Sequence, residues 1–293
     1  MLRVIDATAQ VDGLFPGGRF DLTRWEGYIN AVYPGSSAMF REDADACAAG
    51  GTFTFERDFL PVIQNVYRNP ELDTLRASFS AVTHGLEERI RRQFGQGLDA
   101  DLTLYLGLCN GAGWAAELAG RDVVLLGIEK ILELNWQGLE AMTGLVYHEL
   151  GHVYHRRHGA LDQGAENGPE GFVWQLFTEG VAMCFEQDLA GNSRWFHQDS
   201  GGWLAWCEAN FSQILADFDR DLPAMTRQNQ RYFGDWCDYQ GWGDAGYYLG
   251  ARFVRRLLER FTFQQVIVLT PERVCGLYRE FVGLYAQPRT ILI

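Results

Sequence analysis

His148-Glu149-Leu150-Gly151-His152 carries the strongest structural signal in this chain of 293 residues. The histidines are four positions apart, so on a helix both imidazoles project from one face and can bind the same metal ion. Glu149 lies about 100° around the helix from His148, which places its carboxylate beside the ion as a general base and not as a ligand. A chance match to H-E-x-x-H, given the His and Glu content of the chain, has a likelihood of roughly 1 in 100, so the surrounding residues must support the interpretation.

The residues around this motif predict a buried helix. The helix should run from about Leu139 to His158 and end at Gly159. Apolar side chains occur on several sides of the motif, which suits a buried helix better than an exposed one with incidental charges. They are Leu145, Val146, Leu150 and Val153. Four of the six histidines of the chain fall between 148 and 158, a concentration that packing alone does not require.

A catalytic zinc site takes three protein ligands and leaves one position open for water, so a third ligand must exist. One candidate is Glu179, on a helix predicted after the polar loop that follows Gly159. The other is His158, because six residues beyond His152 is the spacing of H-E-x-x-H-x-x-G-x-x-H. That pattern needs a sharp turn at a glycine where this chain has His155, and a continuous helix would point His158 about 240° away from His152. The backbone argument therefore favours Glu179.

Two further residues share a helix face with the candidate ligands. His155 follows His152 by three positions, so it could support a ligand, contact a substrate or be a buried, hydrogen-bonded histidine. Glu186 follows Glu179 by seven positions, and its carboxylate either orients a ligand imidazole or lies in solvent. The sequence leaves both roles open.

The remaining patterns predict an α+β protein. Residues 1–100 should be a mainly helical region, and residues 101–293 should contain a small sheet and the motif helix, with the whole forming one continuous structural unit. Strands are expected at 102–106 and 122–128, and the turn residues 110–113 between them suggest an antiparallel pair. Helices are expected at 21–33, 56–67, from after Pro70 to Phe94, and at 172–189, 245–260 and 271–285.

Composition and charge exclude several classes of function. The formal net charge is −13, so the surface would repel the phosphates of nucleic acid. No apolar run approaches the roughly 18 to 20 residues of a membrane span, and the N-terminus lacks the pattern of a signal peptide, so residence in the cytoplasm is the expectation. The six cysteines are spread without close pairs, which favours buried free thiols. The dense aromatic residues between 195 and 248 are expected mainly in packing.

Three motifs together resemble the gluzincin branch of the zincin metallopeptidases, and in particular bacterial predicted zinc-dependent peptidases that join H-E-x-x-H to a downstream E-G-x-A. The matches are residues 148–152, Glu179-Gly180-Val181-Ala182, and Ala245-Gly246-Tyr247-Tyr248-Leu249-Gly250, the last of which is similar to a G-Y-x-x-G helix start. Residues 1–100 lie outside the resemblance. Met183 stands where the thermolysin pattern has an aspartate, so the outer partner of His148 is not identified.

This resemblance implies a zincin-like fold, mainly helical, with a small mixed or antiparallel sheet beside the motif helix. The edge strand of that sheet would lie along the cleft, and residues 122–128 are expected to form it. Tyr247 would donate a hydrogen bond to the oxyanion of a tetrahedral intermediate, with Tyr248 and His197 as rivals for this role. Zinc would have three protein ligands, which are His148, His152 and Glu179.

The implied function is that of a zinc metallopeptidase, which hydrolyses a peptide or protein substrate through a zinc-activated water with Glu149 as general base. The alternative is a catalytically inactive zincin-like scaffold that binds peptides or proteins, with its zinc structural or absent. The intact Glu149 speaks against this alternative, because a scaffold has no use for the base. Zinc content and peptide cleavage distinguish the two.

Overall fold

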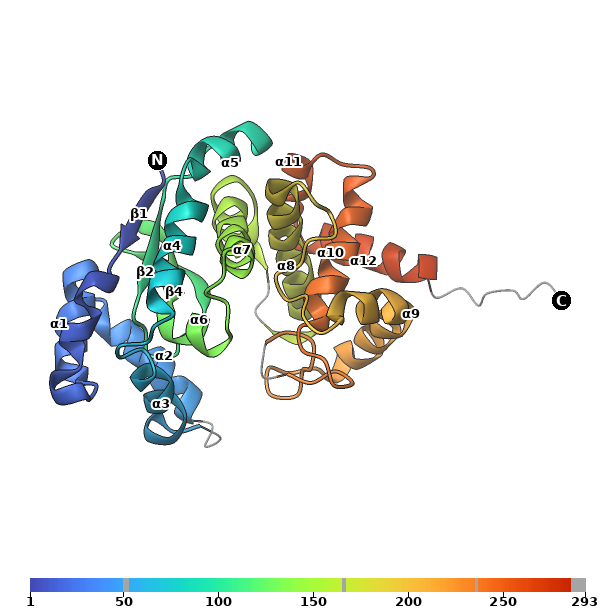
Figure 1. Cartoon of the computed structure of the whole chain (residues 1–293). Helices are drawn as coiled ribbons and strands as arrows, with labels where there is room; N and C mark the ends of the chain where they lie inside the picture. The colour runs from blue at the N-terminus through green and yellow to red at the C-terminus, as the bar shows by residue number, and fades with distance from the viewer. Residues whose placement is uncertain (50–52, 165–166, 235–236, 286–293) are drawn as a thin grey trace. The chain divides into compact units, whose positions relative to one another are not determined.

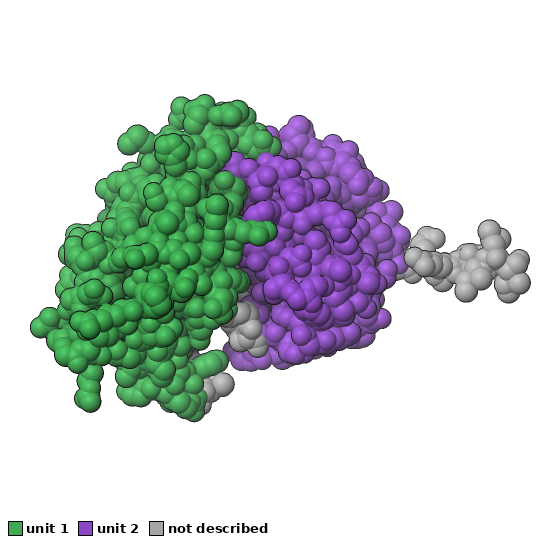
Figure 2. Space-filling view, in the orientation of Figure 1, with its two compact units in different colours: residues 1–153 green, residues 154–293 purple. Residues whose placement is uncertain are grey.

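The computed structural model describes residues 1–49, 53–164, 167–234 and 237–285 (Figure 1). By its internal contacts the chain divides into two compact units, residues 1–153 and 154–293 (Figure 2). The division falls within the motif helix. The protein is mainly helical with one small mixed sheet, so the expected α+β class is confirmed.

The N-terminal unit contains a four-stranded sheet in the order β1-β2-β4-β3. Its strands are β1 (Arg3–Asp6), β2 (Ala100–Tyr105), β3 (Gly113–Leu118) and β4 (Arg121–Gly127). β2 is parallel to both β1 and β4, whereas β3 is antiparallel to β4. The first hundred residues thus share this sheet with the residues that follow them.

Two expectations about the sheet were wrong. The two predicted strands, observed as β2 and β4, pair in parallel, and β3 forms where only turn residues and a connection were expected. Residues 122–128 are also not an edge strand, because β4 lies between β2 and β3. The reason is the two-residue turn at Ala119 and Gly120, both with positive φ, which folds β3 back as a hairpin against the free side of β4.

The helices of the N-terminal unit follow most of the predicted pattern. Asp21 caps the first helix by accepting a hydrogen bond from the backbone N–H of Arg24. The helix predicted from Pro70 to Phe94 is instead two helices, because Gly85 adopts a left-handed conformation with φ of 65° between them. The α-helices are α1 (Leu22–Val32), α2 (Ser37–Ala49), α3 (Leu60–Gln64), α4 (Leu72–Thr83), α5 (Leu86–Phe94), α6 (Ile128–Glu133) and α7 (Leu139–His158).

Helices α1 and α2 pack on the sheet through aromatic side chains. The indole of Trp25 donates a hydrogen bond to the carbonyl oxygen of Leu106 over 2.9 Å. Tyr33 and Thr103 share a buried hydrogen bond of 2.6 Å between their hydroxyls. The rings of Phe40 and Tyr105 lie 5.5 Å apart. These contacts connect the helices to β2 and to the residue that follows it, and they leave the strand buried along its whole length.

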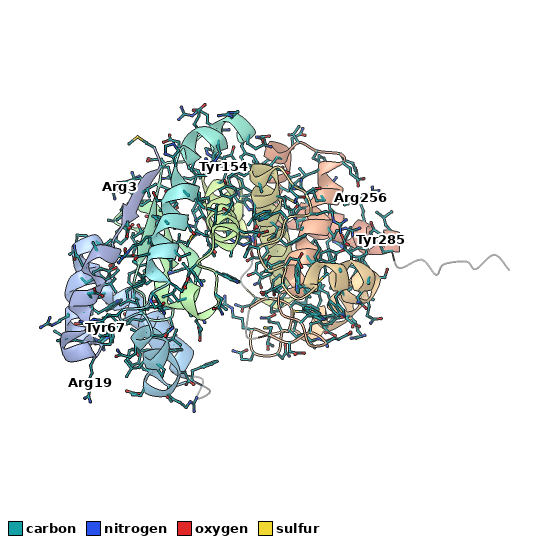
Figure 3. All side chains as sticks on the ribbon, in the orientation of Figure 1. Arg3, Arg19, Tyr67, Tyr154, Arg256 and Tyr285 are labelled. Carbon is teal, nitrogen blue, oxygen red and sulfur yellow. The ribbon has the colours of Figure 1, made fainter. Side chains whose placement is uncertain are left out.

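The C-terminal unit is built around the contact between α8 (Gly168–Ala190) and α10 (Ala245–Leu258). Aromatic rings fill the space between its helices, and Tyr154, labelled in Figure 3, is fully buried. Trp203, Tyr239 and Tyr248 are buried as well, which confirms that aromatic residues between 195 and 248 serve packing. Trp236 lies outside the described residues. The remaining helices are α9 (Trp203–Asp221), α11 (Phe263–Val266) and α12 (Pro271–Tyr285).

The five cysteines whose side chains are described carry thiols and not disulfides, as expected, but only Cys184 and Cys207 among them are buried. The side chain of Cys47 lies outside the described part of the chain. Among the described residues, no helix combines the length and the apolar character needed to cross a membrane.

Candidate functional site

Helix α7 places the H-E-x-x-H motif within a continuous run of twenty residues, as the sequence predicted. The four apolar side chains that flank the motif are all buried, with at most 3% of their surface exposed. His148 and Glu149 are also buried, at 4% and 8% exposure, whereas His152 is half-buried. Polar side chains are thus held inside an apolar helix environment, where they need partners.

The two motif histidines point their imidazoles at a common position. The Nε2 atoms of His148 and His152 lie 3.2 Å apart, and the rings are nearly perpendicular, at 84°. Two nitrogens that each lie 2.0 to 2.1 Å from a tetrahedral zinc ion would be about 3.3 to 3.4 Å apart, so the observed separation fits shared ligation. The same distance also allows one ring to donate a hydrogen bond to the other when no ion is bound.

Glu149 lies against the start of the edge strand β3. A Cβ atom added to Gly113 would lie 2.7 Å from the Cγ of Glu149, 2.9 Å from its Oε1 and 2.8 Å from the Cδ1 of Leu145. Only a glycine therefore allows the strand to approach the helix this closely. This contact helps to fix where the Glu149 carboxylate lies. The sequence pattern assigned Gly113 to a turn and gave no indication of the contact.

A second buried carboxylate, Glu129, stabilises the segment that leads to β3. Its oxygens accept hydrogen bonds from the backbone N–H groups of Gly107, over 2.8 Å, and Cys109, over 3.0 Å. Burial raises the pKa of Glu129 to about 7, although these hydrogen bonds oppose the shift. In the sequence Glu129 only marks the end of an apolar run, and no local signal identifies it as a buried residue.

In the C-terminal unit, Glu179 is a half-buried residue of α8 next to a very close helix contact. A Cβ on Gly180 would lie 2.2 Å from the carbonyl oxygen of Gly250, and one on Gly250 would lie 2.4 Å from that of Leu176. The glycines of the E-G-x-A and G-Y-x-x-G motifs therefore have a structural role, because they let α8 and α10 meet backbone to backbone. This contact fixes the segment of α8 that carries Glu179.

Glu186 and His197 form a buried pair in the same unit. The Nδ1 atom of His197 lies 3.1 and 3.0 Å from the two carboxylate oxygens of Glu186, whose side chain is fully buried. A carboxylate that accepts from Nδ1–H leaves Nε2 of the imidazole as the nitrogen that can bind another group. Of the two roles considered for Glu186, the orientation of an imidazole is the one observed, but the imidazole is that of His197.

The two tyrosines proposed as oxyanion donors have different surroundings. Tyr247 is half-buried on α10, with its ring 6.0 Å from that of Phe233. Tyr248 is buried among aromatic side chains, and its hydroxyl accepts a hydrogen bond of 2.9 Å from Arg252. Packing and this hydrogen bond account for Tyr248, so Tyr247 and the rival His197 stay the candidates.

The other histidines of α7 lie among aromatic rings. His155 is fully buried, 5.6 Å from the ring of Phe177 in an edge-to-face arrangement. His158 lies 4.5 Å from the ring of Tyr154. Because α7 continues through His158, this side chain leaves the helix in a different direction from His152, as the backbone argument predicted.

Two groups of three side chains within the described ranges could bind a metal ion. Imidazole and carboxylate donors of this kind suit zinc, although they do not identify the metal. His148 belongs to both groups, whereas His158 belongs to neither. The groups are His148, His152 and Glu179, and His148, Glu186 and His197.

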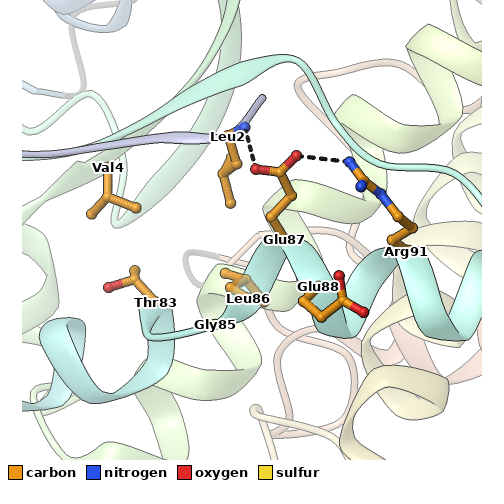
Figure 4. A pocket seen from close by; sticks show the side chains of 8 residues that line it. All are labelled: Leu2, Val4, Thr83, Gly85, Leu86, Glu87, Glu88 and Arg91. Carbon is orange, nitrogen blue, oxygen red and sulfur yellow. Dashed lines mark hydrogen bonds and ion pairs between the residues drawn. The ribbon is translucent and has the colours of Figure 1, made fainter.

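A cavity of about 390 Å³ in the N-terminal unit contains none of these residues (Figure 4). Two carboxylates line it, Glu87 and Glu88, and Glu87 already accepts hydrogen bonds from the backbone N–H of Leu2 and from Arg91. The lining contains no histidine or cysteine, so it does not resemble the metal-ligating groups described above.

Comparison with known proteins gives no relative. No protein-family description, curated protein or solved structure matches the chain.

Proposed function

We propose that this protein is a zinc-dependent metallopeptidase with a zincin-like active site, in which His148, His152 and Glu179 bind the metal. The observation that carries the proposal is the 3.2 Å separation of the Nε2 atoms of His148 and His152, since it suits two ligands of one tetrahedral ion. The resemblance of three motifs to gluzincins supplies the reaction class.

Zinc in such a site supplies a Lewis acid and lowers the pKa of a bound water to about 7. Glu149 lies next to His148 on α7, so its carboxylate would act as the general base, taking a proton from the attacking water and returning it to the leaving amine of the substrate. The Gly113 contact restricts the position of the Glu149 side chain. Tyr247 donates a hydrogen bond to the oxyanion that forms on the scissile carbonyl.

The first experiment separates metal binding from chemistry. Purified protein is analysed for zinc and incubated with a pool of peptides whose cleavage is followed by mass spectrometry. Glu149→Gln should retain the zinc and lose on the order of 10²- to 10⁴-fold in turnover, because only the base is removed. Glu140→Gln is the matched control, since it removes an exposed carboxylate from the first turn of the same helix. Equal cleavage by wild type and Glu149→Gln would refute the mechanism.

The second experiment tests the ligand set. Glu179→Ala and His148→Ala should each lose the zinc, whereas His158→Ala should retain it. Loss of zinc in His158→Ala but not in Glu179→Ala would assign the third ligand to His158. Stoichiometric zinc without any peptide cleavage would instead favour the peptide-binding scaffold.

A further inference from the structure

The C-terminal unit contains a second, smaller cavity of about 170 Å³. Its wall is formed by the end of α8, the segment that follows it, α9 and α10. Aromatic and aliphatic side chains line part of it, but three arginines distinguish it from an ordinary packing defect. The residues are Gln187, Ser193, Arg194, Phe196, Leu204, Glu208, Tyr248, Ala251, Arg252 and Arg255.

Two of the three arginines have carboxylate partners. Arg194 forms an ion pair of 2.9 Å with Glu208, which also lines the cavity. Arg255 forms one of 2.7 Å with Asp188 and donates two hydrogen bonds to the side-chain oxygen of Gln187. The charges of these two guanidinium groups are therefore compensated.

Arg252 differs, because within the described part of the chain no carboxylate lies within ion-pair distance of it. Its guanidinium donates one hydrogen bond, of 2.9 Å, to the hydroxyl of Tyr248 and lies over the ring of Phe211, 4.5 Å from the centroid. The ring and the hydroxyl restrict the guanidinium, and most of its five N–H donors find no acceptor among the described residues. An uncompensated, oriented arginine thus lines this cavity in a chain whose net charge is −13.

We propose that this cavity binds a small oxyanion, a carboxylate or a phosphate group, through the guanidinium of Arg252. Planar guanidinium donors match the paired oxygens of both groups, and a bidentate contact of this kind is the strong form of such a hydrogen bond. The cavity of about 170 Å³ suits a small anion better than a drug-sized molecule, whose sites measure about 300 to 1,000 Å³. The proposal does not depend on peptide hydrolysis, since all these residues lie in the C-terminal unit and none is a proposed zinc ligand.

The test is direct titration of the whole protein with sodium phosphate and with sodium acetate, each against sodium chloride at equal ionic strength. Isothermal titration calorimetry should show saturable binding of one of the two anions. Arg252→Gln should weaken it at least about tenfold, the loss expected when one charge-assisted contact is removed. Phosphate binding alone assigns a phosphate group, and acetate binding alone assigns a carboxylate.

Arg256→Gln is the matched control, because Arg256, labelled in Figure 3, lies one turn further along α10. It pairs with Glu259 and does not line the cavity. It should leave the affinity unchanged. If Arg252→Gln does not fold, Arg252→Lys, which keeps the charge but loses the planar fork, should also weaken binding. No saturable binding of either anion to the wild type, or equal binding by wild type and both Arg252 variants, would overturn the proposal.

Discussion

Replacing Gly113 with alanine tests whether the edge strand controls the position of the proposed base. The new Cβ would lie 2.7 Å from the Cγ of Glu149 and 2.8 Å from the Cδ1 of Leu145. Ordinary carbon–carbon contacts are about 3.5 to 4.0 Å, so roughly 1 Å of overlap must be relieved. Leu145 can rotate its terminal methyl group away, but the Cγ of Glu149 is close to the helix backbone and moves only with the whole side chain.

A catalytic group displaced by about 1 Å loses on the order of 10²-fold in rate. We therefore expect Gly113→Ala to lower kcat/KM by about this factor for a peptide found in the pool, while overpacking lowers the free energy of unfolding by about 1 to 3 kcal/mol. The zinc content should stay unchanged, because the closest contacts of the new methyl group are to Glu149 and Leu145 and not to a proposed ligand. Steady-state kinetics, metal analysis and urea denaturation measure the three quantities.

Gly138→Ala is the control for this substitution. A Cβ at this position has nothing within 4 Å, and Gly138 directly precedes α7 in the same unit. Its activity and stability should match those of the wild type. If Gly113→Ala is folded, binds zinc and cleaves peptides as fast as the Gly138→Ala control, then the strand does not position Glu149 and the reasoning fails.

Three further substitutions test the packing and electrostatics described above. Gly250→Ala should destabilise the C-terminal unit by about 3 kcal/mol, because its Cβ would meet the Leu176 carbonyl oxygen at 2.4 Å, and a normal urea midpoint would contradict the close contact of α8 and α10. Tyr239→Phe should lower the free energy of unfolding by about 2 kcal/mol, since it removes the 2.7 Å hydrogen bond to the buried Asp217, and a neutral effect in the same assay would refute this. In the folded protein the pKa of Glu129 is about 7, above its ordinary value of 4.5. The contribution of its protonated carboxyl group to the free energy of unfolding is therefore fully present below about pH 4.5 and is lost as the pH rises through 7, by about 3 kcal/mol in total. Glu129→Gln should lack this part of the pH dependence, which urea denaturation at pH 5 and pH 8 measures. Identical pH profiles for variant and wild type would show that the carboxyl group does not titrate in this range.

Much of the helical structure could be predicted, because its signals are local. The α7 helix was predicted with its observed bounds from apolar spacing and a terminal glycine, and its 3.6-residue repeat alone brings His148 and His152 onto one face. The same repeat separates His158 from them. The sheet was harder, since β1 is a four-residue, largely exposed strand and β3 begins at a glycine within a turn-like sequence. Neither has the alternation of a typical strand.

The residues that surround the motif could not be predicted from neighbouring sequence. Gly113 is separated from Glu149 by 36 positions, and Gly180 from Gly250 by 70, so no periodic pattern connects the members of either pair. Glu129 resembles any charged residue at the end of an apolar strand, and only the folded chain brings the N–H groups of Gly107 and Cys109 to its carboxylate.

Local sequence was sufficient for the identity and relative direction of the two motif histidines and of Glu149, because the geometry of a single helix determines them. Tertiary folding was needed to place β3 beside that helix and to bury Glu129 beneath the segment that precedes β3. It was also needed to pair Glu186 with His197. Each of these depends on close packing between segments far apart in the chain, where the size of one side chain, or its absence at a glycine, decides which backbone can approach.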